Sequence, residues 1–373
     1  MSITIRILHI VSGDTWGGAE SQLFGLISTL SEQPDIDTSV IVLNHGLLSK
    51  RLNTLAINCL FIDEDKHSTL GLLRALRRSI GDISPDIVHT HGYKQNILGS
   101  LAAFFHRRCL CVRTQHGDWE IPHRVFSMSY VLRSLDLLSA KTIQQGIVAV
   151  SEDLAHSLRR SISTDKITTI ENGIDTAAIE RSNVRRSAKT ENEAYSIAYV
   201  GRMVPVKRVD LFLGAAAIII ERAKIAVVFN VFGDGPKLGE YQKLSQQLDL
   251  TDHVRFHGFV EQLTGQLSKC NLLVMTSDHE GLPMVLLEAL YLKVPVVAPA
   301  VGGIPAVLPR EYGELVNEQT ATAYADAILA CIRRDAELRR NIAYAPCVIE
   351  RRYSTTTQGL AYERFYRRLL SQN

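Results

Sequence analysis

Short apolar runs alternate with longer amphipathic stretches along almost the whole chain, and this alternation most narrows what the chain can fold into. In the first half the apolar runs include residues 5–11, 38–44, 86–91 and 109–116, separated by helical patterns such as 21–30. A strand–helix–strand succession pairs strands in parallel and places helices on both faces of the sheet. The first half therefore predicts a doubly wound α/β domain.

The alternation stops at residues 181–194, which are polar and charged with almost nothing to bury, and then begins again. Apolar runs at 195–202, 226–236, 272–277 and 294–300 belong to the second series. Two such series predict two Rossmann-like doubly wound domains that face each other across a cleft. We expect an N-terminal domain at 1–180, a linker at 181–194 and a C-terminal domain at 195–355.

The charge balance excludes a strongly basic nucleic-acid binder. The 373 residues include 41 basic and 39 acidic side chains, a net charge of +2, so we expect no nucleic-acid partner. The six cysteines are scattered, and only Cys109 and Cys111 are close together, which is weak evidence for a metal site. We therefore expect buried thiols, a usage that fits a reducing compartment. The first residues lack the pattern of a signal peptide, and no uncharged apolar stretch is long enough to span a membrane. We therefore expect a cytoplasmic protein.

The segment of residues 276–303 carries the strongest chemical signal. An apolar strand ends at Ser277, a short loop follows, and Pro283 stands where a helix would start. A buried strand begins at Val294. The loop leaves backbone N–H groups free in front of the positive end of the helix, so the segment predicts a site for an anion or for hydroxyl groups.

Two carboxylates belong to this segment. Glu280 lies in the loop and Glu288 in the second turn of the helix, whose side chains lean toward its N-terminus. A carboxylate can accept hydrogen bonds from two vicinal sugar hydroxyls. The alternative is a helix-start acid and a surface residue, but Glu288 stands on an otherwise apolar helix, which favours a site.

Five motifs, in order and spacing, resemble the GT-B glycosyltransferases of family GT4, which retain the configuration of the transferred sugar. They are GGAE (17–20), VGRMVPVKRVD (200–210), FGDGP (232–236), HGFV (257–260) and EGLPMVLLEAL (280–290). The resemblance covers nearly the whole chain and implies that a last helix, at about 356–373, returns to the first domain. The chain departs from the family where Lys293 and Val294 replace a small residue and a glycine.

The resemblance implies roles for residues of the second domain. Arg202 and Lys207 would bind the donor diphosphate and neutralise the charge that develops on it. Glu288 would bind the ribose and Glu280 the transferred sugar. The remaining donor-binding candidates are the backbone at Gly281 and Leu282, the turn at Gly233, and Phe259 and Val260 at the base. For Gly233 a purely loop-shaping role is the alternative, and for Phe259 and Val260 a plain core role.

The first domain would complete the site. Gly17 and Gly18 follow the first strand, where glycines let the backbone approach a ligand closely. By the resemblance, His116 would lie beside the transferred sugar as a catalytic residue with Arg202, Lys207 and Glu280. His89 and His91 share one face of a strand end, but no third metal ligand is evident. We expect neither a metal nor a cofactor.

The function implied is retaining transfer of a sugar from a nucleotide-sugar donor to a hydroxyl of a glycan or lipid-linked glycan. UDP-sugar is favoured over GDP-sugar, and surface polysaccharide biosynthesis is the expected role. One alternative is a nucleotide-sugar epimerase on the same GT-B fold, which needs no acceptor. A second is a non-catalytic module that binds nucleotide sugars.

Peripheral membrane contact is a separate hypothesis. The helix predicted at 70–80 carries Arg74, Arg77 and Arg78 beside leucines, and residues 104–108 read FFHRR. Basic and aromatic side chains of this kind suit the anionic inner face of the cell membrane, where a lipid-linked acceptor would lie. The alternative is an ordinary packed helix with a solvated face.

Overall fold

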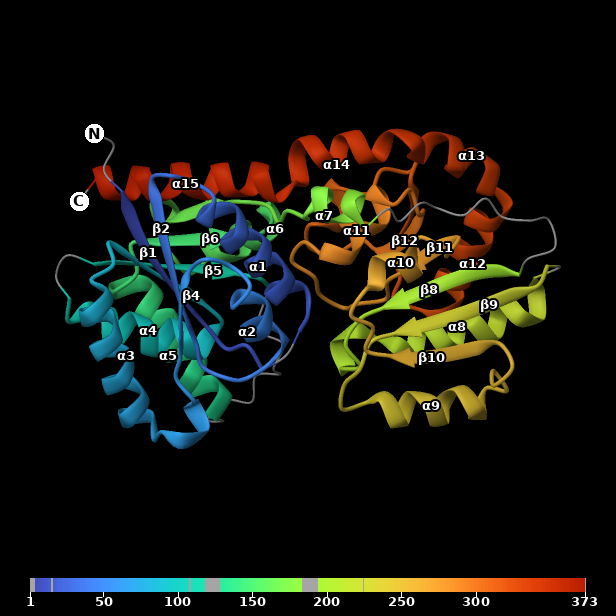
Figure 1. Cartoon of the computed structure of the whole chain (residues 1–373). Helices are drawn as coiled ribbons and strands as arrows, with labels where there is room; N and C mark the ends of the chain where they lie inside the picture. The colour runs from blue at the N-terminus through green and yellow to red at the C-terminus, as the bar shows by residue number, and fades with distance from the viewer. Residues whose placement is uncertain are drawn as a thin grey trace. The chain divides into compact units, whose positions relative to one another are not determined.

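The computed structural model describes residues 4–14, 16–106, 109–117, 128–182, 194–223 and 225–372. It divides into two compact units (Figure 1). The first unit comprises residues 1–173 and 355–373, and the second comprises residues 174–354. Each is an α/β unit with one parallel sheet, so the prediction of two Rossmann-like domains is confirmed.

The first unit contains a seven-stranded parallel sheet in the order β3-β2-β1-β4-β5-β6-β7. Its strands are β1 (Ile5–Val11), β2 (Ile36–Val42), β3 (Asn58–Phe61), β4 (Ile87–His91), β5 (Leu110–Gln115), β6 (Gly146–Ala149) and β7 (Ile167–Thr169). The strand order reverses between β1 and β4, where Ile7 lies opposite Ile87 and His9 opposite His89. In a doubly wound sheet, loops on the two sides of this point diverge and leave room for ligands.

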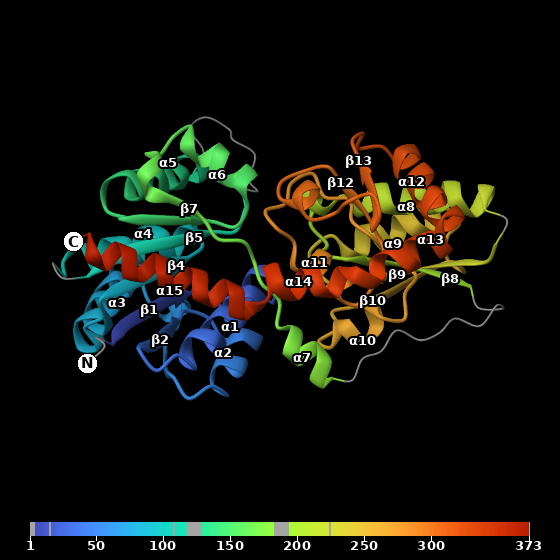
Figure 2. The same ribbon diagram turned by 90° about the horizontal axis from the view of Figure 1, so that it is seen from above.

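Helices cover both faces of this sheet because successive residues of each strand point to opposite sides. Ile5 and Ile7 of β1 pack with α1 (Gly18–Ser31) and α15 (Thr355–Ser371), whereas Leu8 and Ile10 pack with α3 (Thr69–Ile83) and α4 (Tyr93–Phe104). Figure 2 shows α15 lying across the strands of the first unit. The other α-helices of this unit are α2 (Leu47–Leu52), α5 (Met128–Thr142) and α6 (Glu152–Arg159).

The second unit contains a six-stranded parallel sheet in the order β10-β9-β8-β11-β12-β13. Its strands are β8 (Tyr195–Val200), β9 (Val227–Phe232), β10 (Val254–Gly258), β11 (Leu272–Val274), β12 (Val296–Pro299) and β13 (Gly313–Val316). The order reverses between β8 and β11, so this sheet also has one switch point.

Helices pack on both faces of the second sheet as well. One core joins α8 (Val209–Arg222), α9 (Leu238–Gln247) and α12 (Ala321–Arg333) to the strands, and the other joins α10 (Leu263–Leu267), α11 (Met284–Tyr291) and α14 (Ala345–Tyr353). The helices α7 (Thr176–Arg181) and α13 (Asp335–Asn341) complete the unit. No helix among the described residues is both long and apolar enough to cross a membrane.

The chain passes between the units at two neighbouring points. The N–H of Ile174 donates to the carbonyl of Tyr353 over 2.8 Å, and Ile174 also forms an isolated parallel bridge with Ser354. This boundary precedes the predicted linker at 181–194, of which 183–193 lie outside the described residues. Ile179 of α7 is buried in a core of the second unit.

Candidate active site

Two loops leave the carboxyl ends of β8 and β11, the neighbouring strands at which the second sheet reverses its order. The first loop, residues 201–208, includes a 3-10 turn at Pro205–Lys207. The second loop covers residues 275–283. The N–H of Asp278 donates to the carbonyl of Val206 over 2.8 Å, which joins the loops to each other. Ligands of α/β sheets bind at such a switch point.

A cation and a carboxylate, one from each loop, meet at this point. Lys207 Nζ lies 2.6 Å from Glu280 Oε1, and the two side chains are only 23% and 10% exposed. The hydroxyl of Ser277 donates to the same carboxylate oxygen over 2.7 Å. Two of the predicted site residues are therefore adjacent. A phosphate group that binds Lys207 must compete with Glu280 for its charge.

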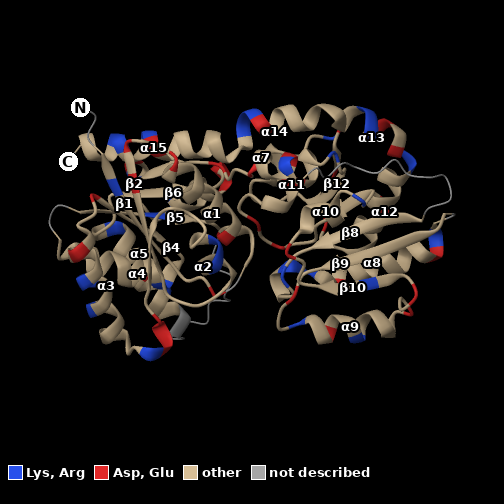
Figure 3. Ribbon diagram, in the orientation of Figure 1, with Lys and Arg blue, Asp and Glu red and all other residues tan. Residues whose placement is uncertain are grey.

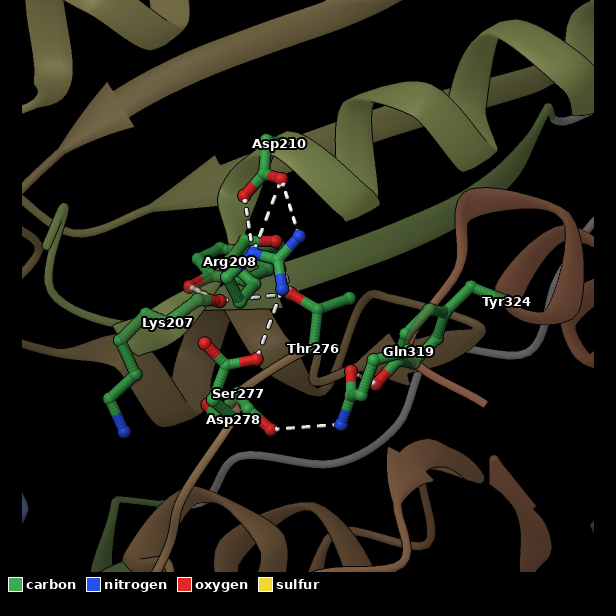
Figure 4. A network of polar contacts seen from close by, with 9 residues as sticks. Lys207, Arg208, Asp210, Thr276, Ser277, Asp278, Gln319 and Tyr324 are labelled. Atoms are coloured by element: carbon green, nitrogen blue, oxygen red, sulfur yellow. Dashed lines mark hydrogen bonds and ion pairs between the residues drawn. The ribbon is translucent and has the colours of Figure 1, made fainter. Parts of the chain in front are cut away.

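Arg208 holds the second charged contact between the loops, and sequence reasoning missed it. Its guanidinium lies between Asp210, 2.9 Å from Nη2, and Asp278, 3.1 Å from Nη1 (Figure 4). Hydrogen bonding to Asp210 raises the pKa of Arg208. The backbone of Arg208 is left-handed, with φ of 47°, a conformation that disfavours residues with a Cβ. The side chain of Lys207 points away from this network (Figure 4).

Hydroxyl groups hold the backbone of the first loop. The hydroxyl of Thr276 lies 2.9 Å from the carbonyl oxygen of Lys207 and 2.8 Å from that of Arg208. The hydroxyl of Tyr199 donates to the Lys207 carbonyl over 3.2 Å. The second loop is held from behind, because the Gln319 amide donates to the carbonyl of Ser277 over 3.3 Å. The position of Lys207 is therefore fixed by its own backbone as well as by Glu280.

Two glycines press the neighbouring turns against these loops. Gly233 has φ of 128°, and a Cβ built there would lie 1.9 Å from the carbonyl oxygen of Gly201. Gly302 has φ of 56°, and its Cβ would lie 1.9 Å from the carbonyl oxygen of Glu280. A side chain at either position would push a site loop away. Gly233 therefore holds its turn against the backbone of Gly201, the residue before Arg202.

Two further predicted donor-binding residues, Glu288 and Arg202, have side chains without a polar partner among the described residues. Glu288 is half-buried on α11, and its carboxylate has no side-chain or backbone partner among the described residues. Burial raises the pKa of Glu288 from its ordinary value of 4.5 to about 7. The Arg202 guanidinium is exposed and has no ion pair in the described part of the chain. Gly281 and Leu282 are buried, next to Glu280.

The two residues predicted to bind the base, Phe259 and Val260, follow β10 and differ in their exposure. Phe259 is 49% exposed, so the plain core role considered for its side chain is wrong. Val260 is partly buried and packs against the core that includes α11. Gly258, which ends β10, accepts a hydrogen bond from the N–H of Gly233 over 2.7 Å. The Phe259 ring therefore offers an exposed aromatic face beside the glycine turn.

In the first unit, Gly17 and Gly18 form the start of α1. Gly17 precedes the helix in an extended conformation, with φ of −150°, and its N–H donates to the carboxylate of Glu20 over 2.9 Å. Gly18 is the first helical residue. Neither the conformation nor the surroundings of Gly17 require a glycine, since a Cβ there would meet only the far end of Glu20.

A row of histidines occupies the carboxyl ends of β1, β4 and β5. His9 Nδ1 lies 3.1 Å from His91 Nε2, and His91 Nδ1 lies 3.4 Å from His116 Nε2. Burial lowers the pKa of His9 to about 3 and that of His116 to about 4, and lowers that of His91 well below its ordinary value. These rings are therefore neutral at pH 7. Sequence reasoning singled out His91 and His116 but missed His9, which only the pairing of β1 with β4 brings to them.

His89 belongs to the same group but has different partners. Its Nδ1 lies 2.6 Å from the hydroxyl of Tyr366, and its Nε2 lies 2.9 Å from the hydroxyl of Thr114. The potential ligand atoms of His9, His89 and His91 lie within 4.8 Å of one another. A metal ion could use His89 only at the loss of one of these buried hydrogen bonds. The arrangement is therefore better described as a hydrogen-bonded histidine cluster.

Two family models match consecutive parts of the chain. The model described as Glycosyltransferase Family 4 matches residues 16–178, and the model described as Glycosyl transferases group 1 matches residues 180–346. This chain is a glycosyltransferase of family 4. The family resemblance noted in the sequence is thus confirmed.

Curated relatives of this glycosyltransferase include two bacterial enzymes. The UDP-Gal:alpha-D-GlcNAc-diphosphoundecaprenol alpha-1,3-galactosyltransferase of Escherichia coli is 26% identical over 275 residues, which cover 71% of this chain and 70% of that enzyme. The D-inositol 3-phosphate glycosyltransferase of Streptomyces scabiei is 28% identical over 267 residues, 64% of this chain. The match spans only 58% of the length of the Streptomyces enzyme.

Solved structures show that this glycosyltransferase has the GT-B fold. Anabaena HepE in complex with UDP-glucose matches with a TM-score of 0.79 and 19% identity, over 99% of this chain and 100% of the other. The sucrose-phosphate synthase of Thermosynechococcus elongatus matches with a TM-score of 0.80, also at 19% identity, over 99% and 100% of the two chains. The expected fold class is confirmed.

We predict that Arg208→Gly unfolds at a higher urea concentration than Arg208→Ala. Both variants lose the contacts to Asp210 and Asp278, but glycine accepts the left-handed backbone, which costs other residues about 1–2 kcal/mol. Lys243, exposed within α9, provides the control. At position 243 the alanine variant should unfold at the higher urea concentration, because glycine is about 1 kcal/mol less favourable than alanine inside a helix. Equal urea midpoints for Arg208→Gly and Arg208→Ala would show that the left-handed backbone at position 208 is not strained.

Proposed function

We propose that this glycosyltransferase transfers a sugar from a UDP-sugar to a hydroxyl of a glycan or lipid-linked glycan, with retention of anomeric configuration. The observation that carries the proposal is the contact between Lys207 and Glu280 at the switch point of the second unit. It supplies a cation for a diphosphate and a carboxylate for sugar hydroxyls within one site.

The names of similar proteins support the donor and acceptor classes. The Escherichia coli relative is named for UDP-Gal and for a diphosphoundecaprenol-linked acceptor. HepE was solved with UDP and with UDP-glucose, and Staphylococcus aureus TarM with UDP. A poly(ribitol-phosphate) alpha-N-acetylglucosaminyltransferase of Staphylococcus aureus is a further relative. These names favour UDP-sugar over GDP-sugar, and a role in surface polysaccharide biosynthesis is part of the proposal.

In the proposed complex, Arg202 and Lys207 bind the diphosphate. Arg202 has no ion pair in the described part of the chain, so its charge is available at once. Lys207 exchanges Glu280 for a phosphate oxygen, and this exchange frees Glu280 to accept hydrogen bonds from the sugar. Glu288 binds the ribose. The backbone of Gly281 and Leu282 contacts the sugar, the base stacks near Phe259 and Val260, and Gly233 supports the loop of Arg202.

The chemical step is a displacement on one face of the sugar. The bond between the anomeric carbon and the diphosphate oxygen breaks, the acceptor oxygen bonds to the same carbon, and its proton passes to the departing diphosphate. Arg202 and Lys207 stabilise the negative charge that develops there, and the proposal includes no metal or cofactor. Gly17, Gly18 and His116 are the first unit's proposed contributions, with His116 beside the transferred sugar.

The alternatives differ in what happens to the sugar. An epimerase would release a free or epimerised sugar without an acceptor, and a binding module would leave the nucleotide sugar intact. Both would use the same cations and carboxylates. The fate of a labelled sugar therefore separates the three functions.

The central prediction concerns Lys207→Ala. With a UDP-sugar labelled in the sugar, the wild-type enzyme should move the label onto a glycan or lipid-linked acceptor. Lys207→Ala should lower the transfer rate by roughly a hundredfold to a thousandfold, the usual effect of removing one group that stabilises developing charge. Lys243→Ala removes the same charge from an exposed helix of the same unit and should transfer at the wild-type rate. Label that stays on nucleotide or on free sugar with every acceptor tested would contradict the proposal.

The raised pKa of Glu288 predicts that donor affinity depends on pH. With a pKa of about 7, the ionised fraction rises from about one tenth at pH 6 to about nine tenths at pH 8. A carboxylate accepts ribose hydroxyls better than a carboxylic acid does, so UDP-glucose should bind more tightly as the pH rises. Calorimetry with UDP-glucose avoids the titrating terminal phosphate of UDP.

Two variants identify the titrating group. Glu288→Gln should bind UDP-glucose more weakly and with the same affinity at pH 6 and pH 8. His279→Asn removes the exposed histidine of the neighbouring loop and should leave the pH dependence unchanged. The opposite pattern, a flat profile in His279→Asn alone, would assign the effect to His279 and argue against Glu288.

We also propose that the first unit contacts anionic membranes. Basic and acidic residues alternate along the ribbons of both units (Figure 3), but Arg74, Arg77 and Arg78 are all exposed on α3. Phe104 and Phe105, at the end of α4, are 63% and 51% exposed, and the Arg77 guanidinium lies 4.6 Å from the centre of the Phe105 ring. Exposed aromatic rings beside cations suit a lipid headgroup region. The enzyme would then work in the cytoplasm at the inner face of the cell membrane.

Co-sedimentation with vesicles tests this contact. The protein should bind vesicles containing phosphatidylglycerol, bind less at high salt, and not bind pure phosphatidylcholine. Replacing both Phe104 and Phe105 with serine should abolish the binding, whereas Lys243→Gln on the second unit should not affect it. Equal recovery of wild-type protein with both kinds of vesicle would rule out the contact.

A further inference from the structure

The histidine cluster of the first unit contains a continuous chain of three rings. His9 contacts His91 through the pair Nδ1 and Nε2, and His91 contacts His116 through the same pair of atoms. The two ends of the chain are His9 Nε2 and His116 Nδ1. Both end atoms are buried, and neither has a hydrogen-bond partner in the described part of the chain.

The order of the nitrogens restricts where the protons can be. A neutral imidazole has one N–H and one lone pair, so each ring can donate at one nitrogen only. If His9 donates from Nδ1, then His91 must accept at Nε2 and donate from Nδ1, and His116 must carry its proton on Nδ1. If His116 donates from Nε2, all three rings carry the proton on Nε2. The three rings therefore share one tautomer.

The surroundings of the three hydrogen-bonded histidines keep their rings neutral. Burial lowers the pKa of His9 to about 3 and of His116 to about 4. His89, whose ring centre lies 4.3 Å from that of His91, is also neutral because its pKa is lowered well below the ordinary value. Both nitrogens of His89 are bound to hydroxyl groups, so His89 does not compete for the nitrogens of His91.

We propose that His91 is a positioning residue that locks His9, His91 and His116 into one shared tautomer, so that Nδ1 of His116 carries a proton only when Nδ1 of His9 and of His91 also do. His91 couples the other two rings because its Nε2 contacts His9 and its Nδ1 contacts His116. The consequence for catalysis rests on the proposed position of His116 beside the sugar. The tautomer itself does not depend on that position.

Two substitutions at position 91 separate the two contacts. The amide of asparagine occupies the place of a histidine Nδ1, so His91→Asn keeps the contact to His116 and loses that to His9. The amide of glutamine reaches the place of Nε2, so His91→Gln keeps the contact to His9 and loses that to His116. The variants are matched in charge and polarity.

The experiment is nitrogen NMR of protein labelled with ¹⁵N in its histidine rings, because the shifts of Nδ1 and Nε2 identify the tautomer. In the wild-type enzyme His9, His91 and His116 should show the same tautomer. In His91→Gln, His116 should populate both tautomers, and in His91→Asn it should keep one. Thermal melting of the variants serves as the control for folding.

The two variants of His91 should also differ in their kinetics. His91→Gln should lower kcat for sugar transfer about tenfold, the effect of one lost hydrogen bond, with an unchanged KM for the UDP-sugar. His91→Asn should stay within about threefold of wild type. Different tautomers among the three wild-type rings, or an unchanged His116 tautomer in His91→Gln, would overturn the inference. The expected spectra without sugar transfer by the wild-type enzyme would support the shared tautomer and contradict the proposed function instead.

Discussion

The parallel pairing of β8 with β11 is the constraint on which the site of the second unit depends. These strands are far apart in the sequence, yet Ile197 lies opposite Leu272 and Tyr199 opposite Val274. Because both strands run the same way, their loops leave at the same edge of the sheet and put Lys207 beside Glu280. The contacts of Arg208 and Thr276 then fix the loops to each other. Without this register, the predicted cation and carboxylate would be two unrelated surface residues.

The sequence predicted the two sheets and most of the candidate site because those features depend on local patterns. Apolar runs mark the buried strands, and the short loops that follow them identify where ligand-binding groups gather. Glu280 and Glu288 stand out for the same reason, since charged residues on an apolar strand–helix segment have few structural roles.

The features that sequence reasoning missed depend on contacts between distant residues or on single backbone conformations. Arg208 reads as a second cation beside Lys207, and only the structure shows its left-handed backbone and its position between two aspartates. Lys293 stands out in the sequence only as a departure from the family, and the structure adds that its backbone is left-handed, with φ of 59°. Phe259 follows an apolar strand and was considered for the core, but the strand ends at Gly258 and leaves the ring exposed.

The polar groups at the two switch points find partners in different ways. In the second unit, charges are paired across loops that water reaches in part. In the first unit, deeper burial leaves neutral histidines that must find hydrogen-bond partners, since an unpartnered buried polar group is costly. Some of these partners come from the end of the chain: the hydroxyl of Tyr366 meets His89, and that of Tyr362 lies 2.8 Å from the hydroxyl of Thr114. Both hydroxyls belong to α15, whose apolar side chains pack on the same sheet. The C-terminal helix therefore supplies polar partners as well as apolar contacts, and through Tyr366 it holds the ring of His89, which stacks on His91.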